Sequence, residues 1–368
     1  MKKLVLFISM FVVLNALNMQ NLQNRCENGN GKVCTGIGLV YQFGYDGVKQ
    51  NYFKARKYLE KGCELKYGAA CSNLGVLYDD GKGVKQNHFK ARKYWEKGCE
   101  LNDGAACNNL GILYRNGYGV KQDYFKARKY WEKGCKLKDG MACNNLGLLY
   151  ANGKGVKQNY FKTRKYWEKG CKLNNGGACN NIGVLYEDGK GVKQNYFKAK
   201  KYYEKSCELN KGQTCLKLGL LYANGKGVKQ NYFKARKYWE KGCKLNNGGA
   251  CYLVGLLYEK GDGVKQNHFK AIKYWEKGCK LDYGKACYNL GVLYDDGKGV
   301  KQNYFKARKY WEKGCKLNVG GACSNLGLLY VKGNGIRQNY SKAKEYFRKG
   351  CDLGEQMGCK GYAILNKQ

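Results

Sequence analysis

Twenty cysteines recur along the 368-residue sequence, in pairs whose members stand eight positions apart. One copy, KGCELNDGAAC at residues 97–107, holds Cys99 and Cys107. Such pairs could form disulfides or ligate a metal. Zinc ligation is not expected, because this separation is not a zinc-ligand spacing and the two histidines, His88 and His268, are far apart in the chain. We therefore predict disulfides, with no metal site and no cofactor.

The separation of eight requires a chain reversal inside each pair. In a continuous helix the two Cα atoms would be ~12 Å apart, whereas a disulfide needs about 4.4–6.8 Å. The LNDG segment between Cys99 and Cys107 can supply the reversal. Pairing Cys71 with Cys99 across a helical hairpin is a second geometric option, but it leaves Cys26 and Cys359 unpaired.

The local scheme uses all twenty cysteines and is favoured, and each small loop should add roughly 2.5 kcal/mol of stability in the chain-entropy model. Its pairs are Cys26–Cys34, Cys63–Cys71, Cys99–Cys107, Cys135–Cys143, Cys171–Cys179, Cys207–Cys215, Cys243–Cys251, Cys279–Cys287, Cys315–Cys323 and Cys351–Cys359.

Other reactive residue types form no catalytic constellation. The only S-x-x-K match runs from Ser341 to Lys344, and the S-D-N and K-T-G elements that accompany it in serine β-lactamases are missing from the sequence. One such match is expected by chance among so many lysines. Adjacent carboxylates at Asp79/Asp80, Glu187/Asp188 and Asp295/Asp296 are interpreted as solvated charges at helix ends. Catalytic residues are therefore unknown, and whether the chain is an enzyme stays open.

Charge points to anionic partners. Lysine and arginine number 68 against 28 acidic residues, a formal net charge of +40. Lipopolysaccharide, acidic glycans and anionic lipids are candidates. Tyrosine and tryptophan interleaved with basic residues are also typical of nucleic-acid binding, but we expect these aromatics on buried helix faces. Nucleic acid is therefore not an expected partner.

Residues 1–25 are interpreted as a signal peptide, because Lys2 and Lys3 precede an apolar run from Leu4 to Leu17 that is too short to span a bilayer. An uncleaved anchor is the alternative. No other apolar run approaches membrane length. The mature chain is expected to be secreted, periplasmic or extracellular, where disulfides persist.

A repeat of 36 residues organises the remaining chain. The motif VKQNY starts at 48, 156, 192, 228 and 300, with VKQNH at 84 and 264, VKQDY at 120 and IRQNY at 336. Nine units of this length predict a solenoid, because each unit must stack on its neighbours to bury its apolar face. The one irregularity, FGYDGV in the first unit, is expected in a loop.

Each unit should contain two helices. Residues 69–79 place Cys71, Leu74, Leu77 and Tyr78 on one face at helical spacing. The following DGKGV breaks the helix, with Gly81 as a left-handed cap.

The second helix is expected over residues 88–101, with Asn87 as its N-cap. Its buried face should hold Ala91, Tyr94, Trp95 and Cys99. Glycines in the middle of the first helix, such as Gly75, should each cost about 1 kcal/mol relative to alanine. We expect a tyrosine or tryptophan of the packing helix to approach each of them closely.

The run from Gly104 to Ala127, G-x-x-C-x-N-L-G-x-L-Y-x-x-G-x-G-V-x-Q-[ND]-x-x-K-A, resembles the Sel1-like repeat, a relative of the tetratricopeptide repeat. Two cysteines per unit make the chain similar to the Helicobacter cysteine-rich proteins over residues 26–366. The resemblance implies an all-α fold, a right-handed α/α superhelical solenoid with a concave groove and one disulfide per repeat. It also implies penicillin binding with weak β-lactamase activity, and peptidoglycan fragments as possible ligands of the groove.

The expected organisation is a signal peptide at 1–25, nine repeats at 26–346, and a last disulfide with a capping helix at 347–368. The expected function is binding of protein or peptide ligands in the groove of a monomer. Asparagine amides offer both donors and acceptors to a peptide backbone, although bonding between neighbouring units would explain them equally well. The candidate positions are Asn73, Asn109, Asn145, Asn181, Asn289 and Asn325. Selectivity would come from variable charges at the ends of the first helices.

Overall fold

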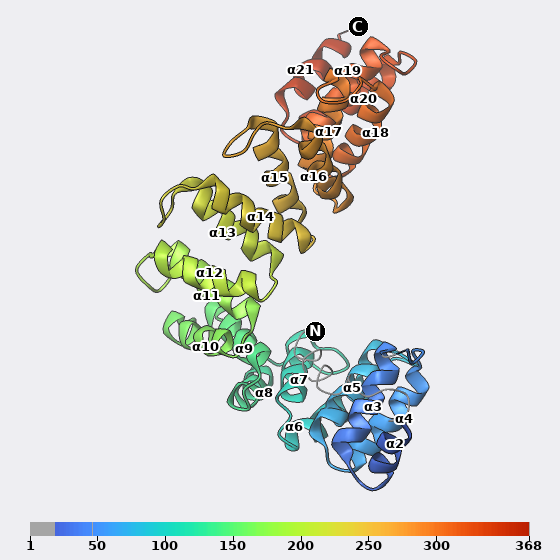
Figure 1. Cartoon of the computed structure of the whole chain (residues 1–368), viewed down its shortest axis with the longest axis vertical. Helices are drawn as coiled ribbons and strands as arrows, with labels where there is room; N and C mark the ends of the chain where they lie inside the picture. Colours follow the sequence, from blue (N-terminus) through green and yellow to red (C-terminus); the bar gives the residue numbers. More distant parts are fainter. Residues whose placement is uncertain (1–18, 46, 368) are drawn as a thin grey trace. The chain divides into compact units, whose positions relative to one another are not determined.

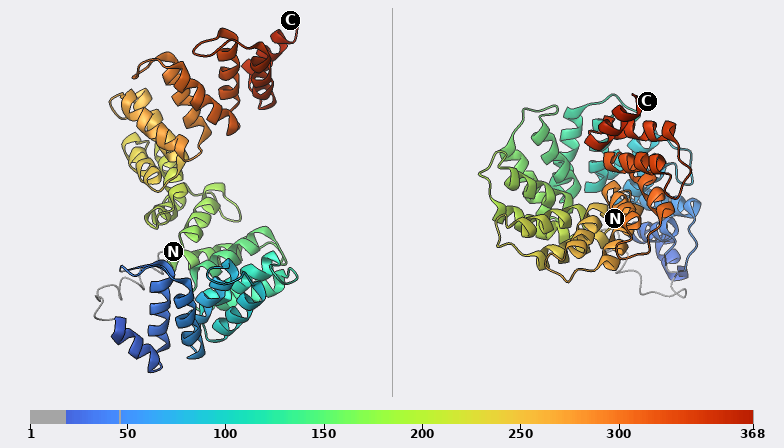
Figure 2. Two further views of the ribbon diagram at one scale, coloured as in Figure 1. Left: turned by 90° about the vertical axis from the view of Figure 1, so that its right-hand side faces the viewer. Right: turned by 90° about the horizontal axis from the view of Figure 1, so that it is seen from above.

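The structure, a computed structural model, describes residues 19–45 and 47–367, and over these residues it is entirely helical. Twenty helices, α2 to α21, follow one another without a strand in this part of the chain. Figures 1 and 2 show them as successive antiparallel pairs. The predicted all-α solenoid is confirmed.

Every repeat supplies a first and a second helix of 13 residues. The first helices are α3 (Gly31–Phe43), α5 (Gly68–Asp80), α7 (Gly104–Asn116), α9 (Gly140–Asn152), α11 (Gly176–Asp188), α13 (Gly212–Asn224), α15 (Gly248–Lys260), α17 (Gly284–Asp296) and α19 (Gly320–Lys332). The second helices are α4 (Tyr52–Glu64), α6 (His88–Glu100), α8 (Tyr124–Lys136), α10 (Tyr160–Lys172), α12 (Tyr196–Glu208), α14 (Tyr232–Lys244), α16 (His268–Lys280), α18 (Tyr304–Lys316) and α20 (Tyr340–Asp352).

The repeats are grouped into two compact units. The first extends to Leu185 and includes Lys190–Lys193, and the second comprises Tyr186–Gly189 and the chain from Gln194. Within each unit, second helices pack on the first helix of their own repeat and on that of the next, as α6 does on α5 and α7 and α14 does on α13 and α15. Consecutive first helices also touch, as α5 and α7 do in the first unit and α13 and α15 in the second. The first helices therefore form the more closely packed layer of each unit.

A large side chain pressed on a glycine joins the two helices of a repeat. Trp95 of α6 lies over Gly75 of α5, so close that a Cβ on the glycine would overlap the indole. The indole Nε1 donates to the Ser72 carbonyl oxygen at 3.0 Å. The expected approach to the mid-helix glycine is confirmed. Tyr94, in contrast, is only half-buried, because the helical period places it at the edge of the buried face. Its ring stacks on Tyr78 with centroids 5.4 Å apart.

The connection between the helices is capped at both ends. Gly81 adopts φ 67° after α5, as predicted. The Asn87 side chain accepts a hydrogen bond from the Lys90 backbone N–H, which confirms the N-cap of α6. The segment FGYDGV begins at Phe43, the last residue of α3, and continues into the loop between α3 and α4, as predicted. Its Asp46 lies outside the described residues.

All ten disulfides follow the local scheme, with Cα–Cα distances from 4.4 to 4.8 Å. The reversal is made by a residue in the left-handed region, such as Asn102 at φ 62°. The Asp103 backbone N–H then donates to the Gly98 carbonyl oxygen. Each bridge thus ties the end of one repeat to the start of the next, and ten of them indicate an oxidising, extracytoplasmic environment.

The folded chain begins earlier than the expected boundary at Cys26. Met19–Glu27 forms helix α2, whose Met19 and Leu22 pack against the buried Val33 and Ile37 of the first repeat. The expected signal segment therefore overlaps α2 over residues 19–25, and its apolar run lies outside the described residues. At the other end, α21 (Gln356–Leu365) packs on α19 and α20. Among the helices described here, none is long and apolar enough to cross a membrane.

Replacing glycine by alanine should have opposite effects on stability at a helix glycine that contacts a tryptophan and at one that contacts nothing. Gly111→Ala should lower the free energy of unfolding by about 1–2 kcal/mol, because its Cβ would overlap Trp131 and outweigh the gain in helix propensity. Gly36→Ala, in α3, meets no atom within 4 Å and should raise it by about 1 kcal/mol. Chemical denaturation of the oxidised variants measures both. A stabilising Gly111→Ala would contradict the packing.

Candidate binding surfaces

The serine and the lysine of the S-x-x-K match lie in different surroundings. Ser341 lies in the first turn of α20 and is exposed. The Lys344 ammonium lies over the ring of Tyr362, 5.9 Å from its centroid. The lysine is therefore held by the C-terminal helix, whereas a serine nucleophile needs a base within hydrogen-bond reach.

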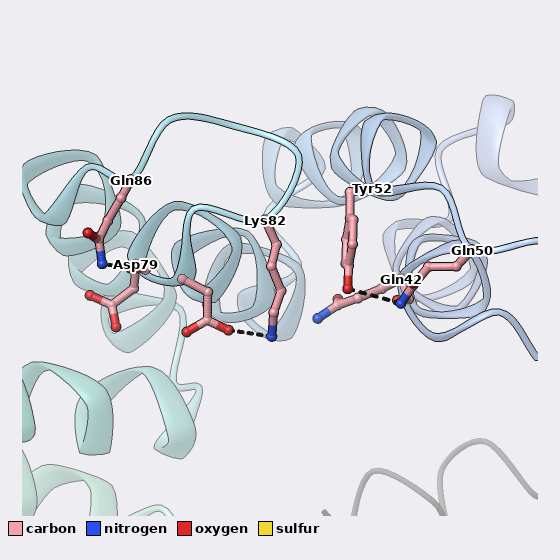
Figure 3. Close-up of polar contacts among 7 residues, drawn as sticks. Gln42, Gln50, Tyr52, Asp79, Lys82 and Gln86 are labelled. Carbon is pink, nitrogen blue, oxygen red and sulfur yellow. Dashed lines mark hydrogen bonds and ion pairs between the residues drawn. The ribbon is translucent and has the colours of Figure 1, made fainter.

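The paired carboxylates at the ends of first helices bond to neighbouring side chains. Figure 3 shows the first example: Asp80 accepts from the Lys82 ammonium at 2.8 Å, and the Gln86 amide reaches the backbone oxygen of Asp79. The Asp79 carboxylate lies 2.7 Å from the Nδ1 atom of His88. In the fifth repeat the Tyr203 hydroxyl donates to Glu187 at 2.5 Å. These carboxylates stabilise helix ends and loops.

The second histidine repeats the arrangement of the first. The His268 Nδ1 atom lies 2.6 Å from a Glu259 carboxylate oxygen, nine positions earlier in the chain. Within the described residues, no three histidine, cysteine, aspartate or glutamate side chains gather in a way that could hold a metal ion.

The six candidate asparagines lie half-buried on the first helices, and several bond across the seam between repeats. The Asn145 amide donates to the Asn108 side-chain oxygen at 2.9 Å, 37 positions earlier. Asn181 donates to Asn144 in the same way. Asn73 instead donates to the Ala69 carbonyl oxygen of its own helix at 2.7 Å.

Later in the chain, tyrosine replaces the asparagine that accepts the hydrogen bond between neighbouring repeats, at the same position of the first helix. Asn289 and Asn325 hydrogen-bond the hydroxyls of Tyr252 and Tyr288, which stand where Asn108 and Asn144 stand earlier. The asparagine rows therefore bond neighbouring repeats. An amide has further donor and acceptor capacity, so these bonds leave room for a ligand as well.

Pairs of stacked tyrosines form a second seam. Tyr258 of α15 stacks on Tyr274 of α16 with centroids 5.9 Å apart. The Arg236 guanidinium of the preceding repeat donates to the Tyr258 hydroxyl, and the Tyr274 hydroxyl lies 3.5 Å from Glu240. Burial first, and then the neighbouring carboxylate, raises the pKa of Tyr274 to about 12. The same causes raise the pKa of Tyr238 and Tyr310 to about 12.

These tyrosines make stability depend on alkaline pH. Their folded-state pKa values lie above the ordinary value of 10.0, so the unfolded chain loses protons first as the pH rises. The stability that they contribute is complete below pH 10 and should be lost as the pH approaches 12. Denaturant unfolding at several pH values measures the fall. It should be shallower when Tyr238, Tyr274 and Tyr310 are all phenylalanine, and an equal fall would contradict the assignment.

Sequence reasoning missed the glutamine of the VKQN motif. Its amide donates to a carbonyl oxygen in the last turn of the preceding helix, as Gln86 does to Asp79 and Gln50 to Gln42 (Figure 3). The same bond occurs in all nine repeats, with Gln122, Gln158, Gln194, Gln230, Gln266, Gln302 and Gln338 as the other donors. The repeated motif thus serves in large part to fix the loop to the last turn of the preceding helix.

The expectation that aromatic side chains of the second helices are buried is wrong for the position of Phe89, and holds only in part for Tyr94, which is half-buried. Phe89 is 52% exposed, and the phenylalanines at its place in seven other repeats are similarly exposed. Phe89 lies about 200° around the helix from Ala91, so the 3.6-residue period already places it opposite the buried stripe. The buried aromatic positions are those of Trp95 and its equivalents.

Comparisons with known proteins agree with this fold. The family profile of the Sel1 repeat matches residues 32–67, 68–103, 104–139, 140–175, 177–211, 213–247, 249–283, 284–319 and 321–355. No curated protein matches the sequence.

Among solved structures, the chain is similar to a Sel1 repeat protein from Oxalobacter formigenes, with 22% identity, coverage of 94% of this chain and 90% of that one, and a TM-score of 0.63. It is similar to c5321, a protective antigen of uropathogenic Escherichia coli displaying an SLR fold, with 24% identity, 95% and 82% coverage, and a TM-score of 0.57. Helicobacter pylori cysteine rich protein B is 39% identical over 37% of this chain and 98% of its own, with a TM-score of 0.31. The profile matches extend over nearly the whole described chain, and the protein therefore belongs to the Sel1 repeat family.

Proposed function

We propose that the chain is an exported scaffold that binds an extended peptide or protein segment along the first helices of its repeats. The observation that supports this most is the row of half-buried asparagine amides at one register position of successive first helices. A peptide backbone presents alternating donors and acceptors, which amides can pair with whatever the peptide sequence.

Selectivity would come from the helix ends. The corresponding positions carry Asp79, Arg115, Ala151, Glu187, Ala223, Glu259, Asp295 and Val331, so the charge varies along the row, with one basic, four acidic and three uncharged residues. A peptide with a complementary charge pattern would be preferred over others. Export would use the apolar run that precedes α2.

The asparagine proposal is tested by separating binding from seam stability. A peptide is first selected from a random displayed library on the oxidised full chain. Changing Asn109, Asn145 and Asn181 together to Ala should weaken its capture about a hundredfold or more, since three paired amides are lost.

The matched control changes Asn108 and Asn144 to Ala. This variant removes the seam acceptors for Asn145 and Asn181 but keeps the proposed ligand-binding amides. It should unfold as easily as the triple variant and still bind. Equal loss of binding in both variants would assign the asparagines to seam packing alone.

Penicillin binding with weak β-lactamase activity, which the family resemblance implies, is the second candidate. Because Ser341 is exposed and Lys344 is held by Tyr362, we expect Ser341→Ala to leave any turnover of a chromogenic cephalosporin unchanged. Loss of turnover in that variant would make Ser341 the nucleophile.

A further inference from the structure

Eight phenylalanines occupy the same exposed position at the start of successive second helices. Their exposed fractions lie between 51% and 67%, whereas the residue six positions later, a tryptophan in six of these repeats and Leu59 or Tyr203 in the other two, is almost completely buried. They are Phe53, Phe89, Phe125 and Phe161 in the first unit and Phe197, Phe233, Phe269 and Phe305 in the second. Single exposed aromatics are common on protein surfaces, but a row in register is not scattered in this way.

At least one basic side chain from the next turn of the helix lies over each of these rings, and two lie over Phe89, Phe125, Phe197 and Phe233. The Arg92 guanidinium and the Lys93 ammonium lie 5.1 and 4.9 Å from the centroid of Phe89. Helical spacing brings residues three and four positions later onto the same face. The ring therefore holds the two cations in place by cation–π attraction. We call the phenylalanines and these two following basic positions the aromatic-basic strip.

Two basic pockets adjoin the strip. A pocket of about 390 Å³ extends from Arg128, whose guanidinium lies over the Phe125 ring, to Lys162 of the next repeat. The Lys162 ammonium lies over the Tyr150 ring, 5.0 Å from its centroid. The lining residues are Arg128, Tyr150, Gly155, Val156, Lys157, Gln158, Asn159 and Lys162.

The preceding repeat has the same pocket, of about 470 Å³, around Arg92, Tyr114 and Lys126. Its one lining carboxylate, Asp123, caps α8 by accepting from the Lys126 backbone N–H. Outside the lining, Glu132 lies 3.8 Å from the Arg128 Nε atom. The two linings contain no other carboxylate than that of Asp123. The lining is therefore dominated by cations.

We propose that the strip in each unit binds an acidic polysaccharide, and that in the first unit its uronate carboxylates occupy the two pockets described above. Cations already held on aromatic rings lose little conformational freedom on binding, which favours anion capture. The pocket volume accommodates a sugar residue between the Arg128 and Lys162 side chains. A polymer with regularly spaced charge can occupy several pockets at once, and such binding gains from multivalency.

The same geometry disfavours the other polyanions. Phenylalanines covered by ammonium and guanidinium groups cannot enter hydrocarbon without desolvating those charges, which opposes insertion into a bilayer. Single-stranded nucleic acid needs ring faces for base stacking, and a base would compete there with the basic groups that lie over these rings. The strip lies on the second helices and none of the candidate asparagines lines its pockets, so the proposal does not depend on peptide binding by the first helices.

The test measures binding of the oxidised full chain to immobilised polygalacturonate. Changing Lys93, Lys129 and Lys237 to Gln removes three cations that lie over Phe89, Phe125 and Phe233. The matched control changes Lys136, Lys172 and Lys244 to Gln, which removes the same charge from exposed positions at the far ends of second helices. The strip variant should bind about tenfold more weakly and the control within about twofold of the unchanged chain.

A second variant keeps the charge. Phe89→Ala with Phe125→Ala removes two platforms and should weaken binding about fivefold while unfolding stays cooperative, since these rings are exposed. Equal weakening in the strip and control lysine variants would overturn the proposal, because binding would then follow net charge alone. Tighter binding to phosphatidylglycerol-containing vesicles or to an oligothymidylate than to polygalacturonate would also overturn it.

Discussion

The insertion of one large side chain over one glycine is the contact on which the repeats depend, and it is found in eight of them. Because the glycine lacks a Cβ, the two helices of a hairpin come close enough for an indole N–H to reach a backbone carbonyl oxygen, as Trp95 does at Ser72. This distance sets how far the second helix stands from the first. It consequently sets where the tyrosine pairs, the asparagine seam and the exposed phenylalanines lie. The last repeat keeps the contact with a different ring, Phe347 over Gly327.

Periodicity and turn chemistry were sufficient to predict the helices, their caps and the disulfides. Gly81, Asn87 and the LNDG turn each act locally, within a few residues, so their roles follow from sequence spacing. The approach of Trp95 to Gly75 was predictable because an unfavourable residue recurring in mid-helix needs a packing reason. The seam was not predictable in the same way. Asn145 hydrogen-bonds Asn108, which lies 37 residues earlier in the chain. Whether these two side chains meet depends on the angle at which the repeats stack.

The two candidate surfaces differ in whether their polar groups are already hydrogen-bonded within the protein. On the first helices the amides are half-buried and already bonded to neighbours, so a ligand there must fit an existing network. On the second helices the cations lie on rings that solvent reaches, and a ligand there meets charges without breaking hydrogen bonds. The first arrangement favours selectivity, and the second favours rapid association at low ionic strength.

The short span of every disulfide has a consequence for how the chain matures. Each cysteine pairs with a partner eight residues later, and the next pair begins only after a further 28 residues, as from Cys107 to Cys135. When the chain enters an oxidising compartment from its N-terminus, each pair can close before the next cysteine arrives. Native pairing is thus also the earliest pairing available. Such a chain can be oxidised repeat by repeat, with little need for disulfide isomerisation.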